Sequence, residues 1–454
     1  MSPYDLTWIS YFIGFVVVYY SVLFAVSLGA QRGRARRAEA VVAGARPPLI
    51  VLLIPARNEE AVLGATLESL RHLDYFRYLV IVLNDGSTDA TGEIAWRRST
   101  EDPRVMLVNR LPQEAGRGKS AVLNRGFDVV NEMLSYGDSR LGGATADEVI
   151  VGILDADGQL EQHAFSRIVP LFADPTVGQV QVGVQIANPG SSFLARMQDM
   201  EFVGFSCLVQ IARDKIGSSG LGGNGQFTRL SALRSLGRQP WAVNALTEDL
   251  DLGLSLVERG WRTRFCPQTY VVQQGLDRWK PLIRQRTRWI QGHYQCWRHV
   301  PSLLKARKVR LATRLDLILY LMLVTTVMLV SYNLVLGLAG TFLGLPVVNN
   351  FLSFMPPGQG QRAVALAFAL GPLVAFVATY QRCSRNPIAW WKVPAYGLAF
   401  TAYTYVWCSA TIWAWTRMVL RRRNWAKTPR LAPVSLPAPS PAQSLQETGS
   451  PGSL

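Results

Sequence analysis

Short apolar runs that end at polar, turn-forming residues recur through the first half of the chain. Four of them predict buried strands, over residues 49–58, 79–84, 105–109 and 149–154. Between the runs, residues 59–71 and 119–134 have the apolar spacing of helices that bury one face. Strands and helices that alternate in this way are typical of a parallel sheet with helices on both faces, so we predict an α/β fold.

Two later segments extend this pattern. Residues 178–187 (GQVQVGVQIA) alternate apolar and polar side chains and predict another strand. Residues 193–213 are amphipathic at helical period, so they belong either to the core or to a helix at a membrane interface, and we expect the interface. Residues 277–300, in which Trp279 and Trp297 lie among arginines, are a second candidate for an interfacial helix.

Four long apolar runs predict membrane spans, over residues 8–30, 316–345, 363–380 and 393–416. The first run has no charged segment before it and no clear cleavage site after it, so we expect a span rather than a signal peptide. Arginines at 32, 34, 36 and 37 follow it, and the positive-inside rule then places the middle of the chain in the cytoplasm.

The expected organisation has four parts. They are an N-terminal span with its basic flank (1–37), a cytoplasmic domain with interfacial helices (38–300), a C-terminal transmembrane region (301–428) and a disordered Pro- and Ser-rich tail (429–454). The expected location is the inner or plasma membrane. The side of the C-terminus stays open: the span count places it outside, whereas Arg417 and the arginines at 421–423 favour the cytoplasm.

The net charge of +16 is clustered rather than spread over the chain. Residues 277–315 contain eleven Lys or Arg and one acid, Asp277. We find no nucleic-acid-binding motif, so a basic belt that faces anionic lipid is the better interpretation. The five cysteines have no metal-ligand spacing, and their odd number predicts no disulfide framework.

Acidic residues follow the predicted strands or begin a predicted helix. They are Asp85 in LNDGSTD, Asp155 and Asp157 in LDADG, and Asp249 in LTEDLDL. Side chains at the carboxyl ends of parallel strands converge on one crevice in an open α/β sheet. Carboxylates of this kind suit a divalent cation that is shared with a diphosphate.

The sequence NDGSTD, DAD, TED and QxxRW, in this order, resembles the membrane-embedded family 2 glycosyltransferases, which include cellulose, chitin, hyaluronan and poly-N-acetylglucosamine synthases. The motifs lie between about residues 49 and 300. The resemblance implies a Rossmann-like GT-A domain, a UDP-sugar donor, Mg²⁺ or Mn²⁺, and transfer to a growing β-linked glycan. It also implies membrane lipid around the spans, extrusion of the product and accessory export proteins.

The resemblance assigns the nucleotide side of the site. Asp85 would contact the uracil and ribose, although an Asx turn or a helix cap would be the better explanation of this residue on its own. Three residues of the first loop would line the same slot: Pro55, Ala56 and Glu59.

The diphosphate side is assigned in the same way. Asp155 would face the nucleotide, and Asp157 would hold the metal. Lys119 in GRGKSAVLN fits the family better than it fits a P-loop, because position 113 is Gln where a P-loop has its leading Gly. By resemblance Lys119 lies near the donor phosphate or sugar.

The acceptor side consists of the TED and QxxRW motifs. Glu248 and Asp249 begin a helix that Thr247 can cap, and acids in a first turn also suit the helix dipole. The functional interpretation makes Asp249 the general base of a single displacement with inversion. Gln285, Arg288 and Trp289 share one helix face, where Arg suits a phosphate and Trp suits a sugar ring.

The combined prediction is an inverting hexosyltransferase that uses UDP-N-acetylglucosamine or UDP-glucose and extends a polysaccharide. The alternative is a non-processive transferase with a lipid-linked acceptor, and product length separates the two. A scaffold with an inactive transferase domain is disfavoured because all the motifs are intact. We expect the loop 222–225 (GGNG) to approach the acceptor, and its Asn224 departs from the small residues of several synthases.

Overall fold

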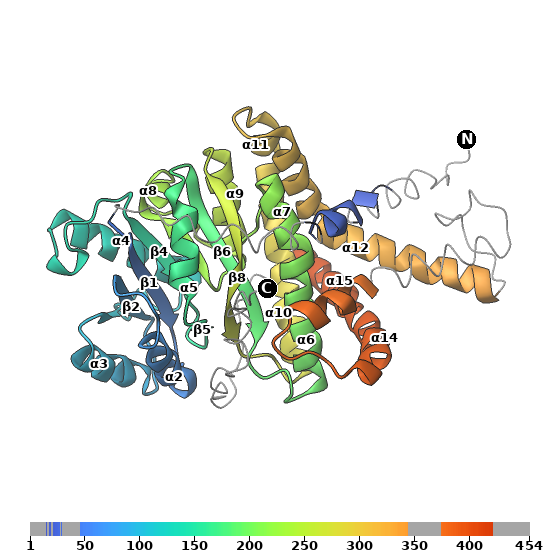
Figure 1. Ribbon diagram of the computed structural model, residues 1–454, viewed down its shortest axis with the longest axis horizontal. Coiled ribbons are helices and arrows are strands. Elements are labelled where there is room, and N and C mark those ends of the chain that lie inside the picture. Colours follow the sequence, from blue (N-terminus) through green and yellow to red (C-terminus); the bar gives the residue numbers. More distant parts are fainter. Residues whose placement is uncertain are drawn as a thin grey trace, which may run out of the picture.

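The computed structural model describes residues 46–343 and 374–420, together with residues 15, 18, 19, 21–27 and 29. Side chains at 327 and 330–343 are outside this description. A sheet with helices on both faces lies beside a layer of helices, from which α12 (Leu311–Leu343) extends (Figure 1).

The described residues form one eight-stranded sheet with the strand order β3-β2-β1-β4-β7-β6-β8-β5. The strands are β1 (Leu49–Ala56), β2 (Tyr78–Asn84), β3 (Val105–Asn109), β4 (Val149–Ile153), β5 (Gln159–Leu160), β6 (Val177–Ile186), β7 (Gln226–Arg229) and β8 (Arg262–Gln273). The first four in chain order are mutually parallel, as predicted, and β1 lies between β2 and β4.

The other half of the sheet is mixed, so the prediction of a parallel sheet is correct for only one half. β7 runs antiparallel to both β4 and β6, whereas β6 and β8 are parallel. The glycine-rich loop before β7 reverses the chain, with Gly223 at φ 70° and Gly225 at φ 68°. β8 was not predicted, because Pro267 interrupts its apolar pattern. The β6–β8 register shifts at this point, where Val182 pairs with Cys266 and Gly183 pairs with Tyr270.

Alternating side chains of β1 divide the core into two layers. Ile50, Leu52 and Ile54 pack with one set of helices: α2 (Glu60–Leu70), α3 (Thr91–Glu101) and α5 (Ala164–Ile168). Leu49, Val51 and Leu53 pack with the other: α4 (Lys119–Ser135), α8 (Leu230–Arg234) and α9 (Glu248–Glu258). This central strand is thus buried on both faces, which explains its nearly continuous apolar sequence.

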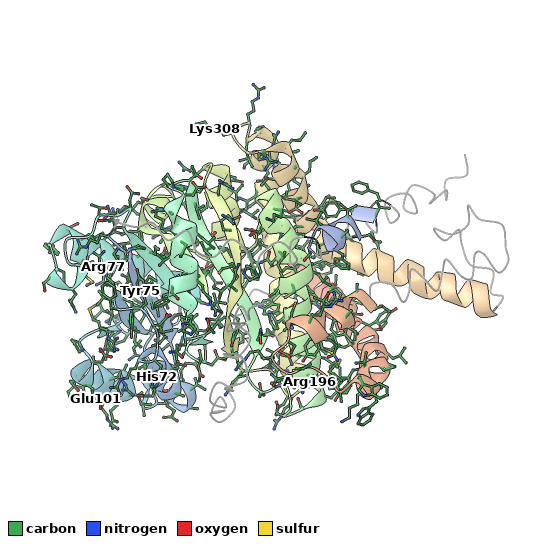
Figure 2. All side chains as sticks on the ribbon, in the orientation of Figure 1. His72, Tyr75, Arg77, Glu101, Arg196 and Lys308 are labelled. Atoms are coloured by element: carbon green, nitrogen blue, oxygen red, sulfur yellow. The ribbon has the colours of Figure 1, made fainter. Side chains whose placement is uncertain are left out.

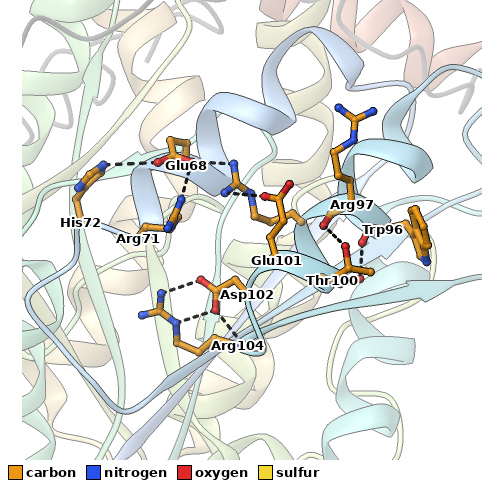
Figure 3. Close-up of polar contacts among 11 residues, drawn as sticks. Glu68, Arg71, His72, Trp96, Arg97, Thr100, Glu101, Asp102 and Arg104 are labelled. Carbon is orange, nitrogen blue, oxygen red and sulfur yellow. Dashed lines mark hydrogen bonds and ion pairs between the residues drawn. The ribbon is translucent and has the colours of Figure 1, made fainter.

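Ion pairs connect α2, α3 and the turn into β3 at the outer edge of the domain (Figure 3). Arg98 of α3 donates from Nη2 to Oε2 of Glu68 on α2 at 2.8 Å. Arg104 donates from Nε and Nη2 to the two oxygens of Asp102, at 3.0 and 2.7 Å. Both pairs are partly buried, with side-chain exposures of 16% for Arg98 and 10% for Asp102, and they lie beside the apolar contacts that pack these elements together.

The helical layer is built from segments far apart in the sequence. It contains α6 (Phe193–Gly204), η4 (Phe205–Gln210), α7 (Ile211–Ile216), α10 (Trp279–Gln295), η5 (Cys296–His299), α11 (Val300–Lys305), the helix over 374–383, α14 (Val393–Thr404) and α15 (Val406–Val419). Shorter helical turns are η2 (Ser139–Leu141), η3 (Val169–Ala173) and η6 (Trp390–Lys392).

The segment 193–213, expected at a membrane interface, is mostly buried within the protein. Leu194, Met197 and Met200 of α6 pack against the 374–383 helix and α14. Arg196, at the lower end of α6 in Figure 2, donates from Nη1 to Tyr380 Oη at 2.9 Å. The alternative assignment of these residues to the core is therefore the one observed.

The predicted spans coincide only in part with described residues. The run 316–345 falls on α12, and the run 393–416 is divided between α14 and α15 at Tyr405. Most of residues 8–30 and 363–380, all of 31–45, 344–373 and the tail from 421 lie outside the description. Among the helices that are described, none has both the length and the apolar character needed to cross a bilayer.

Candidate active site

Asp85 is a buried carboxylate directly after β2. Its two oxygens accept hydrogen bonds from the Gly116 amide, at 3.2 and 3.1 Å, and Oδ1 also accepts one from Nη1 of Arg110. Arg57 Nη1 lies 4.0 Å from Oδ2. Asp85 is therefore surrounded by positive charge at the carboxyl edge of the sheet, rather than being a simple turn residue.

The first loop lies beside Asp85, as predicted. Pro55 and Ala56 end β1, and the Ala56 carbonyl accepts the Asp85 amide at 2.9 Å. Glu59 is buried, and its amide donates to Thr91 Oγ1 at 2.7 Å. The structure thus brings together the residues that were assigned to the nucleotide slot.

Asp155 and Asp157 lie on the tight turn that follows β4. The amide of Gly158 donates to the Asp155 carbonyl at 2.8 Å and closes the turn. Oδ1 of Asp155 accepts from Nζ of Lys119 at 2.6 Å. Oδ2 of Asp157 accepts from the amide of Gln274 at 3.2 Å. The two carboxylates therefore contact different segments of the chain, α4 and the end of β8.

Lys119 is the first residue of α4 and contacts three other segments: the turn after β4, the glycine-rich loop and the start of α9. Besides Asp155, its Nζ donates to the Gly223 carbonyl at 3.2 Å and lies 3.5 Å from Glu248 Oε1. Burial favours the neutral amine, but the carboxylates of Asp155 and Glu248 hold the pKa of Lys119 above its usual value. Lys119 is therefore a fixed positive charge among the acidic motifs.

Asp249 lies in the first turn of α9, beside the glycine loop. Its Oδ1 accepts the Leu250 amide at 2.9 Å. A Cβ added to Gly223 would lie 2.9 Å from Oδ2 of Asp249, so a side chain at that position would displace the carboxylate. Burial, and then the negative charge of Glu248, raise the pKa of Asp249 to about 7. A carboxyl group with this pKa is well suited to general base catalysis near neutral pH.

The helix α10 positions the chain just before Asp249. Arg288 Nη1 donates to the Leu246 carbonyl at 3.2 Å, and Oε1 of Gln295 accepts the Leu246 amide at 3.0 Å. Gly292 faces Thr247, and a Cβ added there would lie 2.5 Å from the Thr247 side chain. Thr247 makes no side-chain capping bond to α9, so the predicted cap is wrong.

The other two residues of the QxxRW motif contact the helical layer. Oε1 of Gln285 accepts from Nη1 of Arg286 at 3.1 Å. The Trp289 ring has Arg286 Cζ 4.1 Å from its centroid, and the rings of Phe202 and Trp407 lie at 6.2 and 6.5 Å. These contacts belong to packing within the protein, and the stacking of Trp289 on a sugar stays a prediction.

Arg110 and Arg286 were absent from the sequence-based assignment, and Asn224 was expected in a loop near the acceptor. Arg110 follows β3 as Asp85 follows β2, so its position after a strand was an available signal. Arg286 is fully buried inside the QxxRW motif, and Asn224 is 1% exposed. No pattern along the chain predicts the burial of the last two residues, because both are surrounded by segments distant in sequence.

Among the described residues, no group of three or more His, Cys, Asp or Glu side chains is arranged to hold a metal ion. A divalent cation at Asp155 and Asp157 would take its other ligands from elsewhere. Mg²⁺ is often held by one or two carboxylates together with substrate phosphates. Two hard oxygen donors on one turn beside a lysine fit that arrangement.

Comparison with known proteins agrees with this geometry. Beta-monoglucosyldiacylglycerol synthase of Synechocystis is 35% identical over 251 residues, which are 55% of this chain and 48% of that protein. Poly-beta-1,6-N-acetyl-D-glucosamine synthase of Staphylococcus aureus is 26% identical over 248 residues, 54% of this chain and 55% of that protein. The matches thus span about half the length of these relatives.

A solved structure shares the fold. It is the mannosyltransferase PcManGT from Pyrobaculum calidifontis in complex with GDP-Man and Mn²⁺, with a TM-score of 0.51, 19% identity, and coverage of 89% of this chain and 99% of that one. The likeness confirms the predicted GT-A-like fold. The model of one family, described as glycosyltransferase like family 2, matches residues 47–292. The chain therefore belongs to the glycosyltransferase like family 2.

Proposed function

We propose that this protein transfers a hexose from a UDP-sugar to a hydroxyl group of a membrane lipid, with inversion at the anomeric carbon. The observation that supports the chemistry best is the position of Asp249. Its carboxylate lies against Gly223, whose carbonyl accepts from the same Lys119 that pairs with Asp155. The proposed base Asp249 is thus connected to the proposed diphosphate-binding turn at Asp155 through Gly223 and Lys119.

The proposed step is a single displacement. Asp249 takes the proton of the acceptor hydroxyl, and the oxygen bonds to the anomeric carbon as the bond to the UDP phosphate breaks. Lys119 and Arg288 are cations near Asp249, and the positive charge of each acts to lower the pKa of Asp249. We assign Lys119 to the departing diphosphate, and Arg288 together with Gln285 to the acceptor side.

The donor side follows from the same geometry. We assign the base and ribose to Asp85 and the first loop, and the diphosphate to Asp155. Asp157, with Asp155, would hold Mg²⁺ or Mn²⁺, which neutralises charge on the leaving diphosphate. The Mn²⁺ in the PcManGT complex supports a divalent cation for this fold and leaves open which ion acts here.

The lipid acceptor is supported by the relatives and by an exposed apolar surface. A glucosyldiacylglycerol synthase is the more similar of the two relatives, and its name indicates a single sugar on a lipid. Large apolar side chains on η6, α14 and α15 are exposed: Trp390, Trp391, Leu398, Ile412, Trp413 and Val419. A surface rich in Trp beside basic residues suits a membrane interface, so we propose attachment to the membrane with the site in the cytoplasm.

The second candidate is a processive synthase that extends a β-linked polysaccharide. The QxxRW motif and the poly-N-acetylglucosamine synthase relative favour it. Such an enzyme would involve a glycan acceptor and, for export, accessory proteins.

One experiment separates the candidates. The purified full chain is given radiolabelled UDP-glucose or UDP-N-acetylglucosamine, with Mn²⁺ and diacylglycerol micelles, and the products are resolved by chromatography and mass spectrometry. A lipid that carries one hexose is the expected result. A ladder of sugars would establish the polymer synthase, and no transfer from either donor would overturn both.

A further inference from the structure

Asn224 is buried beneath the turn that carries Asp155 and Asp157. Its Oδ1 accepts the Asp155 amide at 3.1 Å, and its Nδ2 donates to Oε1 of Gln273 at 2.9 Å. A Cβ added to Gly158 would lie 3.0 Å from the same Oδ1. The Asn224 side chain thus fills the space between the two ends of the turn.

The backbone around Asn224 is fixed from the opposite side. Nε2 of Gln181, on β6, donates to the Asn224 carbonyl at 2.9 Å. The Gly225 amide donates to the Ile153 carbonyl, at the end of β4, at 3.0 Å. Both Oδ1 and Nδ2 of Asn224 are hydrogen-bonded, and its backbone segment is bonded to β6 and to the end of β4. The Asn224 side chain therefore has little freedom to move.

The neighbouring residue, Gly223, contacts the other half of the site. Its carbonyl accepts from Lys119, and its Cα lies against the Asp249 carboxylate. Two consecutive residues therefore contact the donor turn and the proposed base. The segment Gly223–Asn224 sets the separation of these two groups.

The end of β8 completes this arrangement. Gln273 accepts from Asn224, and the amide of the next residue, Gln274, donates to Asp157 at 3.2 Å. Removing the Asn224 amide would take away the acceptor that the partly buried N–H of Asp155 uses, and losing such a hydrogen bond is costly. The turn would then shift until that amide found another acceptor.

From these contacts we infer that Asn224 is a positioning residue for the donor, which fixes the Asp155–Gly158 turn relative to Asp249. This inference rests on the proposed function. It differs from the expectation that the loop 222–225 lies near the acceptor, because the Asn224 side chain contacts the donor turn.

Binding of UDP to the purified full chain, measured by calorimetry with and without Mn²⁺, tests the inference. Asn224→Ala should weaken Mn²⁺-dependent UDP binding roughly 10- to 100-fold, as loss of a group that supports metal ligands typically does. The KM for the donor should rise with it, while the KM for the acceptor stays unchanged.

Asn124→Ala is the matched control. Asn124 is also buried and makes two amide bonds, both to the backbone of Trp241, at 2.8 and 3.2 Å. Both variants should lower the melting temperature, but only Asn224→Ala should weaken the Mn²⁺-dependent binding. Equal UDP affinities in the two variants, or a rise confined to the acceptor KM, would overturn the inference.

Gln273→Ala gives a test that does not depend on the folding of Asn224→Ala. Gln273 is half-buried, and its loss leaves the bond from the Asp155 amide to Asn224 in place. We expect a weaker effect in the same direction, and an unchanged Mn²⁺-dependent UDP affinity would contradict the inference. Absence of UDP binding in the unsubstituted protein would instead refute the proposed function.

Discussion

Arg288 donates from Nη1 to the carbonyl oxygen of Leu246 at 3.2 Å, so the QxxRW helix contacts the main chain three residues before Asp249. The motif is thus hydrogen-bonded directly to the main chain that leads into the helix of the proposed base.

Gly292→Ala tests the importance of this contact between α10 and the segment before α9. The added methyl group would lie 2.8 Å from the Thr247 amide nitrogen, so α10 must move away and Asp249 must shift. We expect a lower melting temperature and a loss of kcat larger than the change in donor KM. Gly64→Ala on α2 is the control, because its Cβ would meet only Ile94, at 3.9 Å, and stability and kcat should be preserved.

Asp249→Asn should abolish transfer and still bind UDP. An amide cannot accept the acceptor proton, and loss of a general base typically costs about 10²–10⁴-fold in rate. In the unsubstituted protein, kcat/KM should rise with pH through about 7, where the Asp249 carboxyl group ionises, and then level off. Near-normal turnover of Asp249→Asn would show that another group is the base.

Asp249→Asn should abolish activity, but it should stabilise the folded protein at high pH. The folded-state pKa of Asp249 is raised to about 7, so the folded protein keeps this proton at pH values where the unfolded chain has lost it. Stability is therefore lost as pH rises from about 4 to about 7, and Asn mimics the neutral form. Melting temperatures should match at pH 4, with Asp249→Asn higher at pH 8. A lower melting temperature at pH 8 would contradict the raised pKa.

Asp157→Ala should weaken metal-dependent UDP binding more than it alters folding. Asp157 lies on a turn, and its described bond is to the Gln274 amide, so little apolar packing is lost. Calorimetric titration of UDP with and without Mn²⁺, together with a melting curve, measures both effects. If the affinity is the same as in the unsubstituted protein under both conditions, the cation binds elsewhere.

Arg286→Met should be strongly destabilising. Arg286 is fully buried and donates to Glu201 at 2.7 Å, and Glu201 also accepts from Tyr403 at 2.6 Å. Removing one partner of a buried ion pair typically costs about 3–5 kcal/mol. Chemical denaturation should show this loss.

Arg97→Met is the matched substitution at the surface. Arg97 pairs with Glu93 at 2.9 Å, and both side chains are about two-thirds exposed, at 65% and 66%. Its effect should stay below about 1 kcal/mol. Similar losses for Arg286→Met and Arg97→Met would mean that the Glu201 pair has no structural importance.

The sequence predicted those parts of the molecule that depend on local pattern. The strands β1 to β4, and the positions of Asp85 and Asp155 after the carboxyl ends of β2 and β4, follow from apolar runs and from the rule for parallel strand ends. β8 was missed because Pro267 and a bulge break its alternation. The buried contacts of Asn224 and Arg286 could not be predicted, because each depends on segments that only the tertiary fold brings together.

The strand order also determines when each part of the sheet can form while the chain is being made on the ribosome. β3, β2, β1 and β4 are complete once residue 153 has been made, whereas β7 pairs with β4 only after residue 226. In the interval the edge of β4, which ends two residues before Asp155, presents unpaired backbone groups that can recruit another chain. Ribosome-bound chains that end between residues 153 and 226 should therefore resist proteolysis in the β3-β2-β1-β4 half of the sheet and should aggregate when released. Chains that include β8 should remain dispersed.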